Sequence, residues 1–315
     1  MNKLCAFCVF LLMTGSIQLS AWADDIPYLL TVASKGDAKS VKAILDTGAN
    51  PNLRDIDGLT ALMYATRKDK VEVVQLLLSK GADPNLRDNS GWTALMYAAK
   101  KNYLSSAKLL LEKGADAKVR DVSGWSALGL AATSGYAEFV SLLIDSGVEV
   151  NSRSDDGKTI IMYAAKNGDR ATIQTLVQHK ADLDARDNQL ATALMYAARS
   201  GRTDGCEELL QGGASIDLTD SSGWSALTWA VRKKQLATAK MLISKGAKVN
   251  VADKSGTYLL HVAVSNNDAK MVALLIEQGA DVNVKDQFSL SPLVYALKNQ
   301  NSEIVNLLKQ AGGSY

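Results

Sequence analysis

The chain is poor in the residues that most active sites and metal sites require. It has 3 cysteines, 2 histidines and 4 prolines in 315 residues. Neither His179 nor His261 has another histidine or a cysteine at metal-ligand spacing. No glycine-rich phosphate loop is present, and no nucleophile stands beside a base. We therefore predict a protein that is not an enzyme and that holds no metal and no cofactor.

An excess of charge of one sign is also missing. The 35 lysines and arginines nearly balance the 33 aspartates and glutamates, which leaves a net charge of +2. Such a balance gives no reason to expect a nucleic-acid partner. The chain also has no low-complexity stretch and no proline-rich linker, so we expect one domain over residues 24–315.

Long apolar runs are absent except at the N-terminus. Lys3 is followed by an apolar run over residues 4–13 and then by Ala21-Trp22-Ala23, a small-x-small pattern. This order is typical of a secretory signal peptide, and the run is too short to span a bilayer. We predict a signal peptide over 1–23, cleaved after Ala23, and a periplasmic or secreted protein without a membrane span. An uncleaved anchor is the alternative.

Cleavage would remove two of the three cysteines, Cys5 and Cys8. Cys206 would then be alone, so the mature chain could form no internal disulfide. Its position matches Val74, Val140 and Ile173 elsewhere in the chain. We interpret Cys206 as a small buried hydrophobic residue, with a redox or catalytic thiol as the alternative.

A repeat is the dominant feature that is present. The sequence Thr-Ala-Leu-Met-Tyr-Ala occurs at 60–65, 93–98 and 192–197; the first two copies begin 33 residues apart and the third begins 99 residues after the second. A fixed period of this size predicts a solenoid. The predicted units are a partial one at 26–54, then 55–87, 88–120, 121–153, 154–186, 187–219, 220–252 and 253–285, and a C-terminal cap at 286–315.

Each unit carries the signals of two helices. A hydroxyl residue that can cap the first helix recurs at Thr60, Thr93, Ser126, Thr159, Thr192, Ser225 and Ser291. The second helix has an apolar stripe, as at Val74, Leu77 and Leu78. A glycine then ends it in most units, as at Gly81 and Gly114.

This pattern resembles the ankyrin repeat, which has an Asp…Gly hairpin, then Thr-Pro-Leu-His-x-Ala-Ala, then Leu-Leu-Leu…Gly-Ala-Asp. The resemblance covers residues 26–315. It implies an all-α solenoid with short β-hairpin-like loops and a protein that binds other proteins. The family's proline is kept only at Pro292 and its histidine only at His261; alanine and methionine mostly replace them.

In the ankyrin fold, the two residues after the Ala-Ala pair face the concave side. Nine of the sixteen residues at these places are basic and none is acidic. We predict that they contact a partner protein with an acidic surface; a solvated face whose bias comes from repeat duplication is the alternative. The predicted contacts are Arg67, Lys68, Lys100, Lys101, Lys166, Arg199, Arg232 and Lys233.

Tryptophans stand at three predicted hairpin tips, Trp92, Trp125 and Trp224, and we predict that they contact the partner too. The alternative is packing on the neighbouring tip. Arginine recurs at the unit junctions, from Arg54 to Arg186, and a column of tyrosine and tryptophan on the first helices is interpreted as packing between repeats.

The sequence therefore predicts an ankyrin-repeat scaffold of an exported bacterial type. It is expected to be monomeric and to bind another protein through a basic, Trp-tipped concave face. A secreted effector that binds a host protein is one alternative, and an envelope tether that holds acidic polymer or lipid head groups by charge is the other. Units 154–219 are the least regular, with Lys180, Leu190 and Gly205 departing from the pattern. We expect either that these units are a locally less stable joint in the solenoid or that their departures have no structural effect.

Overall fold

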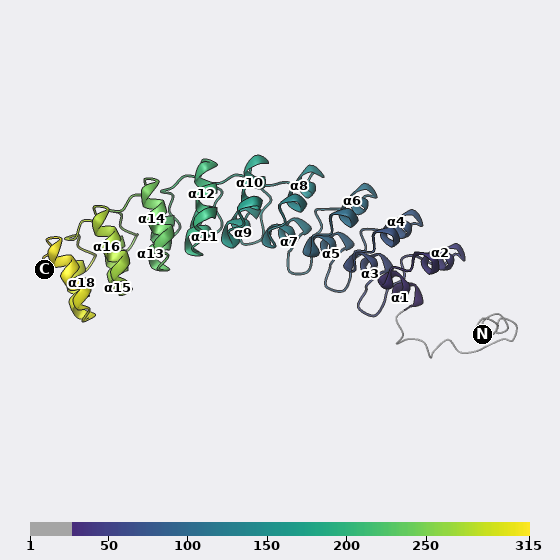
Figure 1. The fold of residues 1–315 in the computed structure, drawn as a ribbon, viewed down its shortest axis with the longest axis horizontal. Helices are drawn as coiled ribbons and strands as arrows, with labels where there is room; N and C mark the ends of the chain where they lie inside the picture. The colour runs from purple at the N-terminus through teal and green to yellow at the C-terminus, as the bar shows by residue number, and fades with distance from the viewer. Residues whose placement is uncertain (1–26) are drawn as a thin grey trace.

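The computed structural model describes residues 27–315, and the predicted signal peptide lies outside them. The described residues form 18 α-helices in successive pairs, stacked into a curved solenoid (Figure 1). The odd-numbered helices line the inner side of the arc and the even-numbered helices its outer side. The pairs are α1 (Tyr28–Lys35) and α2 (Ala38–Asp46), α3 (Ala61–Arg67) and α4 (Val71–Ser79), α5 (Ala94–Lys101) and α6 (Leu104–Glu112), α7 (Ala127–Thr133) and α8 (Ala137–Asp145), α9 (Ile160–Asn167) and α10 (Arg170–Gln178), α11 (Ala193–Arg199) and α12 (Thr203–Gln211), α13 (Ala226–Arg232) and α14 (Leu236–Ser244), α15 (Leu259–Ser265) and α16 (Ala269–Glu277), and α17 (Pro292–Lys298) and α18 (Ser302–Gln310).

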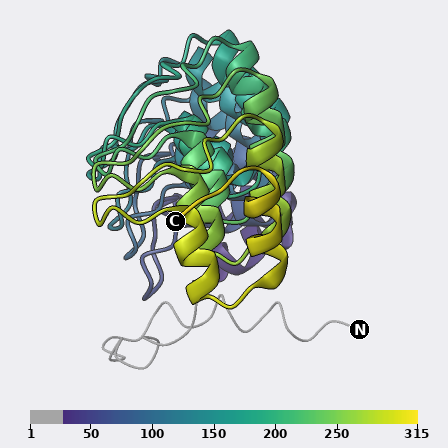
Figure 2. The same cartoon turned by 90° about the vertical axis from the view of Figure 1, so that its left-hand side faces the viewer.

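Hairpin-like loops connect the pairs and project together from one side of the stack (Figure 2). Antiparallel bridges of single residues close four of them, for example Arg54 with Thr60 and Arg120 with Ser126. Residues 27–315 contain no longer strand. The predicted all-α solenoid with short hairpin-like loops is confirmed.

The predicted helix caps are confirmed in part. The hydroxyls of Thr60, Thr93, Ser126 and Ser225 accept hydrogen bonds from the backbone three residues on, which satisfies one free N–H of each helix. The hydroxyls of Thr159, Thr192 and Ser291 make no such bond. The Ser291 hydroxyl instead donates a hydrogen bond to the Ser314 carbonyl at 2.8 Å, so it contacts the C-terminal segment and does not cap α17.

The core lies within and between neighbouring pairs, because one pair alone cannot cover its apolar surfaces. Val74 and Leu77 are fully buried, and Met63 replaces the family's histidine inside the stack. His261 keeps that place and its Nε2 contacts the Leu290 carbonyl at 2.9 Å. Cys206 is buried as predicted, and burial raises the pKa of its thiol to about 12. The protonated, enclosed thiol fits a packing role.

The irregular units, 154–219, contain two strained backbone positions and also polar contacts between neighbouring outer helices. Lys180 and Leu190 hold positive φ angles of 61° and 60° at places where other units have glycine. Against this, Glu208 on α12 is almost buried and pairs with Arg170 at 2.5 Å and with Gln174 at 2.8 Å, both on α10. The strain is therefore confined to two loops, while the outer helices of this region are joined.

Replacing Lys180 with glycine should stabilise the protein by about 1 kcal/mol, because glycine adopts a left-handed conformation without a steric cost. Urea unfolding, with hydrogen exchange over residues 154–219, would measure the gain. The matched reverse change is Gly147→Lys, one repeat earlier, where φ is 92° and a Cβ would meet no atom within 4 Å. It should cost a similar amount, and a neutral result in both variants would contradict backbone strain.

Gly205→Ala is the weaker route to stability, although helix propensity alone favours alanine by about 1 kcal/mol. A Cβ on Gly205 would lie 3.2 Å from Ile173 Cδ1, because α12 approaches α10 closely there. Part of the gain in propensity would be lost to this contact.

Candidate protein-binding surface

The predicted basic residues lie at the C-terminal ends of the odd helices, on the inner side of the arc (Figure 1). Cations are favoured at this end of a helix, where the backbone carbonyls are free. All eight side chains are exposed, and none forms an ion pair within the described part of the chain. They are Arg67, Lys68, Lys100, Lys101, Lys166, Arg199, Arg232 and Lys233.

The three arginines of this set differ from the lysines, because each guanidinium lies over an aromatic ring. Arg67 is 5.1 Å from the centre of the Tyr97 ring. Arg199 is 4.6 Å from that of Trp229, and Arg232 is 3.8 Å from that of Trp224. Such contacts contribute about 0.5–1 kcal/mol at exposed sites. The guanidiniums are thus held in place, whereas the lysine side chains extend freely into solvent.

The aromatic column of the odd helices is anchored to the hairpins. The Tyr64 hydroxyl donates to Asp55 at 2.7 Å, and the same bond recurs in other units, from Tyr97, Tyr196, Trp229 and Tyr295. Burial, and then the hydrogen bond to Asp55, raise the pKa of Tyr64 to about 12. These bonds lie within one unit and fix each ring to its own hairpin, so they do not themselves test the predicted packing between repeats.

Two of the three hairpin tryptophans are also used inside the stack. Trp92 Nε1 donates to Asp121 of the next hairpin at 2.9 Å, and Trp224 Nε1 donates to Asp253 at 3.0 Å. Burial would raise the pKa of Asp253, but hydrogen bonds from Ser255, Trp224 and the backbone outweigh it and hold the pKa below its usual value. The charged carboxylate is a strong acceptor. Packing on the neighbouring tip is thus observed for both indoles, and their contact with a partner stays a prediction.

Trp125 is arranged differently. The residue at the place of the indole's hydrogen-bond acceptor is Ser154, whereas most other units have aspartate there. Within residues 27–315, Trp125 Nε1 donates no hydrogen bond. The ring lies beside Tyr163, with centroids 5.2 Å apart. A Cβ on Gly129, the residue in place of the usual methionine, would be only 3.0 Å from this ring. The small residue lets the indole sit against α7.

The hairpin tips on either side of Trp125 are parted. In the preceding junction, the Val122 N–H donates to the Ser90 carbonyl at 3.2 Å. The equivalent bond from Asp155 to Ser123 is not among the backbone bonds of the described residues, and a Cβ on Gly124 would meet no atom within 4 Å. A gap therefore separates the third and fourth hairpins.

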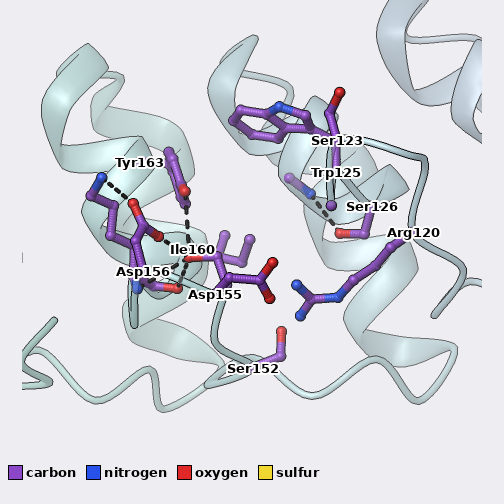
Figure 3. Close-up of a pocket in the computed structure, with 13 residues that line it drawn as sticks. Arg120, Ser123, Trp125, Ser126, Ser152, Asp155, Asp156, Ile160 and Tyr163 are labelled. Carbon is purple, nitrogen blue, oxygen red and sulfur yellow. Dashed lines mark hydrogen bonds and ion pairs between the residues drawn. The ribbon is translucent and has the colours of Figure 1, made fainter. Parts of the chain in front are cut away.

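A pocket of about 240 Å³ occupies this gap (Figure 3). Trp125 and Tyr163 lie on one side, and the Arg120 guanidinium and the Asp155 carboxylate point toward one another on the other side. The pocket thus offers a ring face, a cation, an anion and several hydroxyls, including those of Ser126 and Ser152. This lining can form both ring contacts and hydrogen bonds.

The junction arginines form a ladder that the sequence reasoning missed. Each guanidinium donates to the backbone carbonyl of the residue one repeat later: Arg120 bonds to Arg153 at 2.7 Å, and Arg153 bonds to Arg186 at 2.6 Å. Arg54 and Arg87 begin the ladder. The signal in the sequence was the recurrence of arginine every 33 residues from Arg54 to Arg186, which indicates a contact that is repeated at each of these junctions.

Within residues 27–315, no cluster of histidine, cysteine, aspartate and glutamate could hold a metal ion. No helix of this part combines the length and the apolar character needed to cross a membrane.

Comparison with known proteins agrees with the architecture. The family model described as ankyrin repeats, in three copies, matches residues 29–121, 114–187, 186–253 and 249–314. No curated protein matches the chain. The matched segments together cover nearly all of the described residues, and the chain belongs to the ankyrin-repeat family.

Proposed function

We propose that this protein is a non-enzymatic scaffold that binds an acidic surface of another protein with its concave side. The observation that supports this most is the set of exposed lysines and arginines on the inner ends of α3, α5, α9, α11 and α13, none of them in an ion pair within the described residues. Ankyrin repeats typically bind proteins. Opposite charge on a partner would steer its approach and set its orientation.

The proposal extends to location and assembly. The N-terminal pattern of Lys3, an apolar run and Ala21-Trp22-Ala23 supports export and cleavage after Ala23. The protein would then act as a monomer in the periplasm or outside the cell. A secreted effector that binds a host protein would use the same surface.

An envelope tether is the second candidate, because two of the three hairpin indoles are engaged within the stack. A polyanion held by charge needs the basic side chains and no indole. The two functions therefore differ most at Trp125, whose indole lines the open pocket.

One experiment tests scaffold and export together. The full chain with a C-terminal tag is expressed in its own cells, fractionated, sequenced from its N-terminus and used for affinity capture with and without Trp125→Ala. We expect a chain that starts at Asp24 and a protein partner whose recovery falls at least tenfold in the variant. A chain that starts at Met1 in the cytoplasm would contradict export, and recovery of acidic polymer or lipid regardless of Trp125 would favour the tether.

A further inference from the structure

Two hairpins show how this fold packs an indole. Trp92 lies beside Tyr97 of its own unit with ring centroids 5.0 Å apart, and Trp224 lies beside Trp229 at 4.9 Å. Both Nε1–H groups donate to the first aspartate of the following hairpin. In these two units the indole has two partners, an aromatic ring on the odd helix of its own unit and a carboxylate one unit on.

The fifth unit keeps both partners but lacks the indole. Ala191 occupies the position three repeats after Trp92, while Tyr196 and Asp220 stand at the places of Tyr97 and Asp121. A pocket of about 270 Å³ opens beside Ala191. Its lining includes Met195, Tyr196, Arg199, Asp220 and Trp229.

We propose that this pocket receives a tryptophan side chain of the protein partner, so the inference rests on the proposed function. The ring would enter where Trp92 and Trp224 lie in their own units, beside Tyr196. A cavity of about 150 Å³ is enough for benzene, so the volume admits the larger indole. The concave face and the pocket would then be used by one partner, because Arg199 belongs to both.

Asp220 can accept the added hydrogen bond. Its Oδ1 accepts the N–H groups of Ser222 and Trp224 at 2.9 and 3.0 Å, and its Oδ2 accepts from Trp229 Nε1 at 2.9 Å. Each carboxylate oxygen has about two acceptor sites, so one at Oδ2 stays available for an indole N–H. Phenylalanine would leave this acceptor without its donor, which is why the pocket favours tryptophan.

The pocket can be tested without the partner by using N-acetyl-tryptophanamide as the probe. The mature chain is labelled with ¹³C at the methionine methyl groups, and the probe is titrated to 20 mM. We expect the ring current to shift the Met195 signal, with a dissociation constant of millimolar order for so small a ligand. The signals of Met63, Met96 and Met162, which hold the same place in other units, serve as internal controls and should stay unchanged. N-acetyl-phenylalaninamide should bind at least threefold more weakly.

Ala191→Trp supplies the indole from the chain itself and should remove the Met195 response, with a thermal midpoint no lower than that of the parent. Thr257→Trp is the matched control, because it adds the same side chain at the same position two units later. It should leave the response intact. An unshifted Met195 signal, or a shift that survives in Ala191→Trp, would contradict the proposal that this pocket binds an indole.

The partner is tested separately with the same two variants. Partner binding should fall at least tenfold in Ala191→Trp and stay unchanged in Thr257→Trp. If Ala191→Trp abolishes the probe response but binds the partner like the parent, the partner does not use the pocket. That outcome overturns this inference and leaves the basic concave face as the proposed binding surface.

Discussion

Replacing Lys68, Lys101, Lys166 and Lys233 with glutamate should abolish binding to an acidic partner and leave the fold intact. These lysines are exposed, and they form neither ion pairs nor ring contacts within the described residues. Their exchange therefore breaks no ion pair and no ring contact. Each change does lose the favourable interaction of a cation with a helix C-terminus, which is worth about 0.3–1 kcal/mol, so we expect a small loss of stability and an unchanged fold. Placing like charges against the partner should weaken binding more than 100-fold, or by about 3 kcal/mol.

The measurement is equilibrium binding to the captured partner over a series of salt concentrations, with circular dichroism as the test of folding. Arg199 and Arg232 are kept in this variant, because their loss would also remove ring contacts. Association of the parent should slow as salt rises, since peripheral charges act mainly on the association rate.

The control makes the same change of net charge on the outer side of the arc. It replaces four exposed lysines of the even helices with glutamate: Lys108, Lys240, Lys270 and Lys309. Binding should change by no more than a few-fold. An equal loss in both variants would mean that net charge alone attracts the ligand, as in the tether. Unchanged binding in both would exclude the concave face.

Replacing Asp220 with serine should cost about 2 kcal/mol of stability. Asp220 is almost buried and accepts three hydrogen bonds, from Ser222, Trp224 and Trp229. Serine can accept the backbone bonds only in part, and it leaves the Trp229 indole N–H without its charged acceptor. Bonds to charged groups contribute about 1.5–3 kcal/mol. Urea unfolding followed by tryptophan fluorescence would measure the loss.

The reverse change is available in the same fold, because Ser154 stands where other hairpins have aspartate. Its Oγ is 3.5 Å from the Tyr163 hydroxyl, against 2.7 Å for the bond from Tyr64 to Asp55. Ser154→Asp should therefore stabilise by about 1 kcal/mol and give the Trp125 indole the acceptor that Trp92 has in Asp121. Opposite signs for the two variants are expected. If Asp220→Ser proves neutral, the hairpin aspartates do not hold the loops.

Much of the fold could be predicted because the pattern that encodes it is local and is repeated. A period of 33 residues, a hydroxyl before each odd helix and an apolar stripe on each even helix indicate which surfaces must be buried against a neighbour. Cys206 and His261 followed from the same alignment of units, since equivalent positions have equivalent surroundings. The basic character of the inner helix ends was predicted in the same way.

Whether an individual side chain is bonded or free depends on residues that are about one repeat away from it in the sequence. Trp92 and Trp125 are equivalent in sequence, yet Trp92 is bonded to Asp121 whereas Trp125 has Ser154 in that place and lines an open pocket. Contacts between side chains and neighbouring parts of the stack also produce the arginine ladder and place rings under Arg199 and Arg232. The gap between the third and fourth hairpins is found where such a contact is missing. The sequence by itself determined the repeat, its helices and its buried positions, because these follow from periodicity within a unit. The tertiary structure alone decided which charges and indoles stay free to bind, because a side chain is free or engaged according to what the neighbouring unit places within hydrogen-bonding distance.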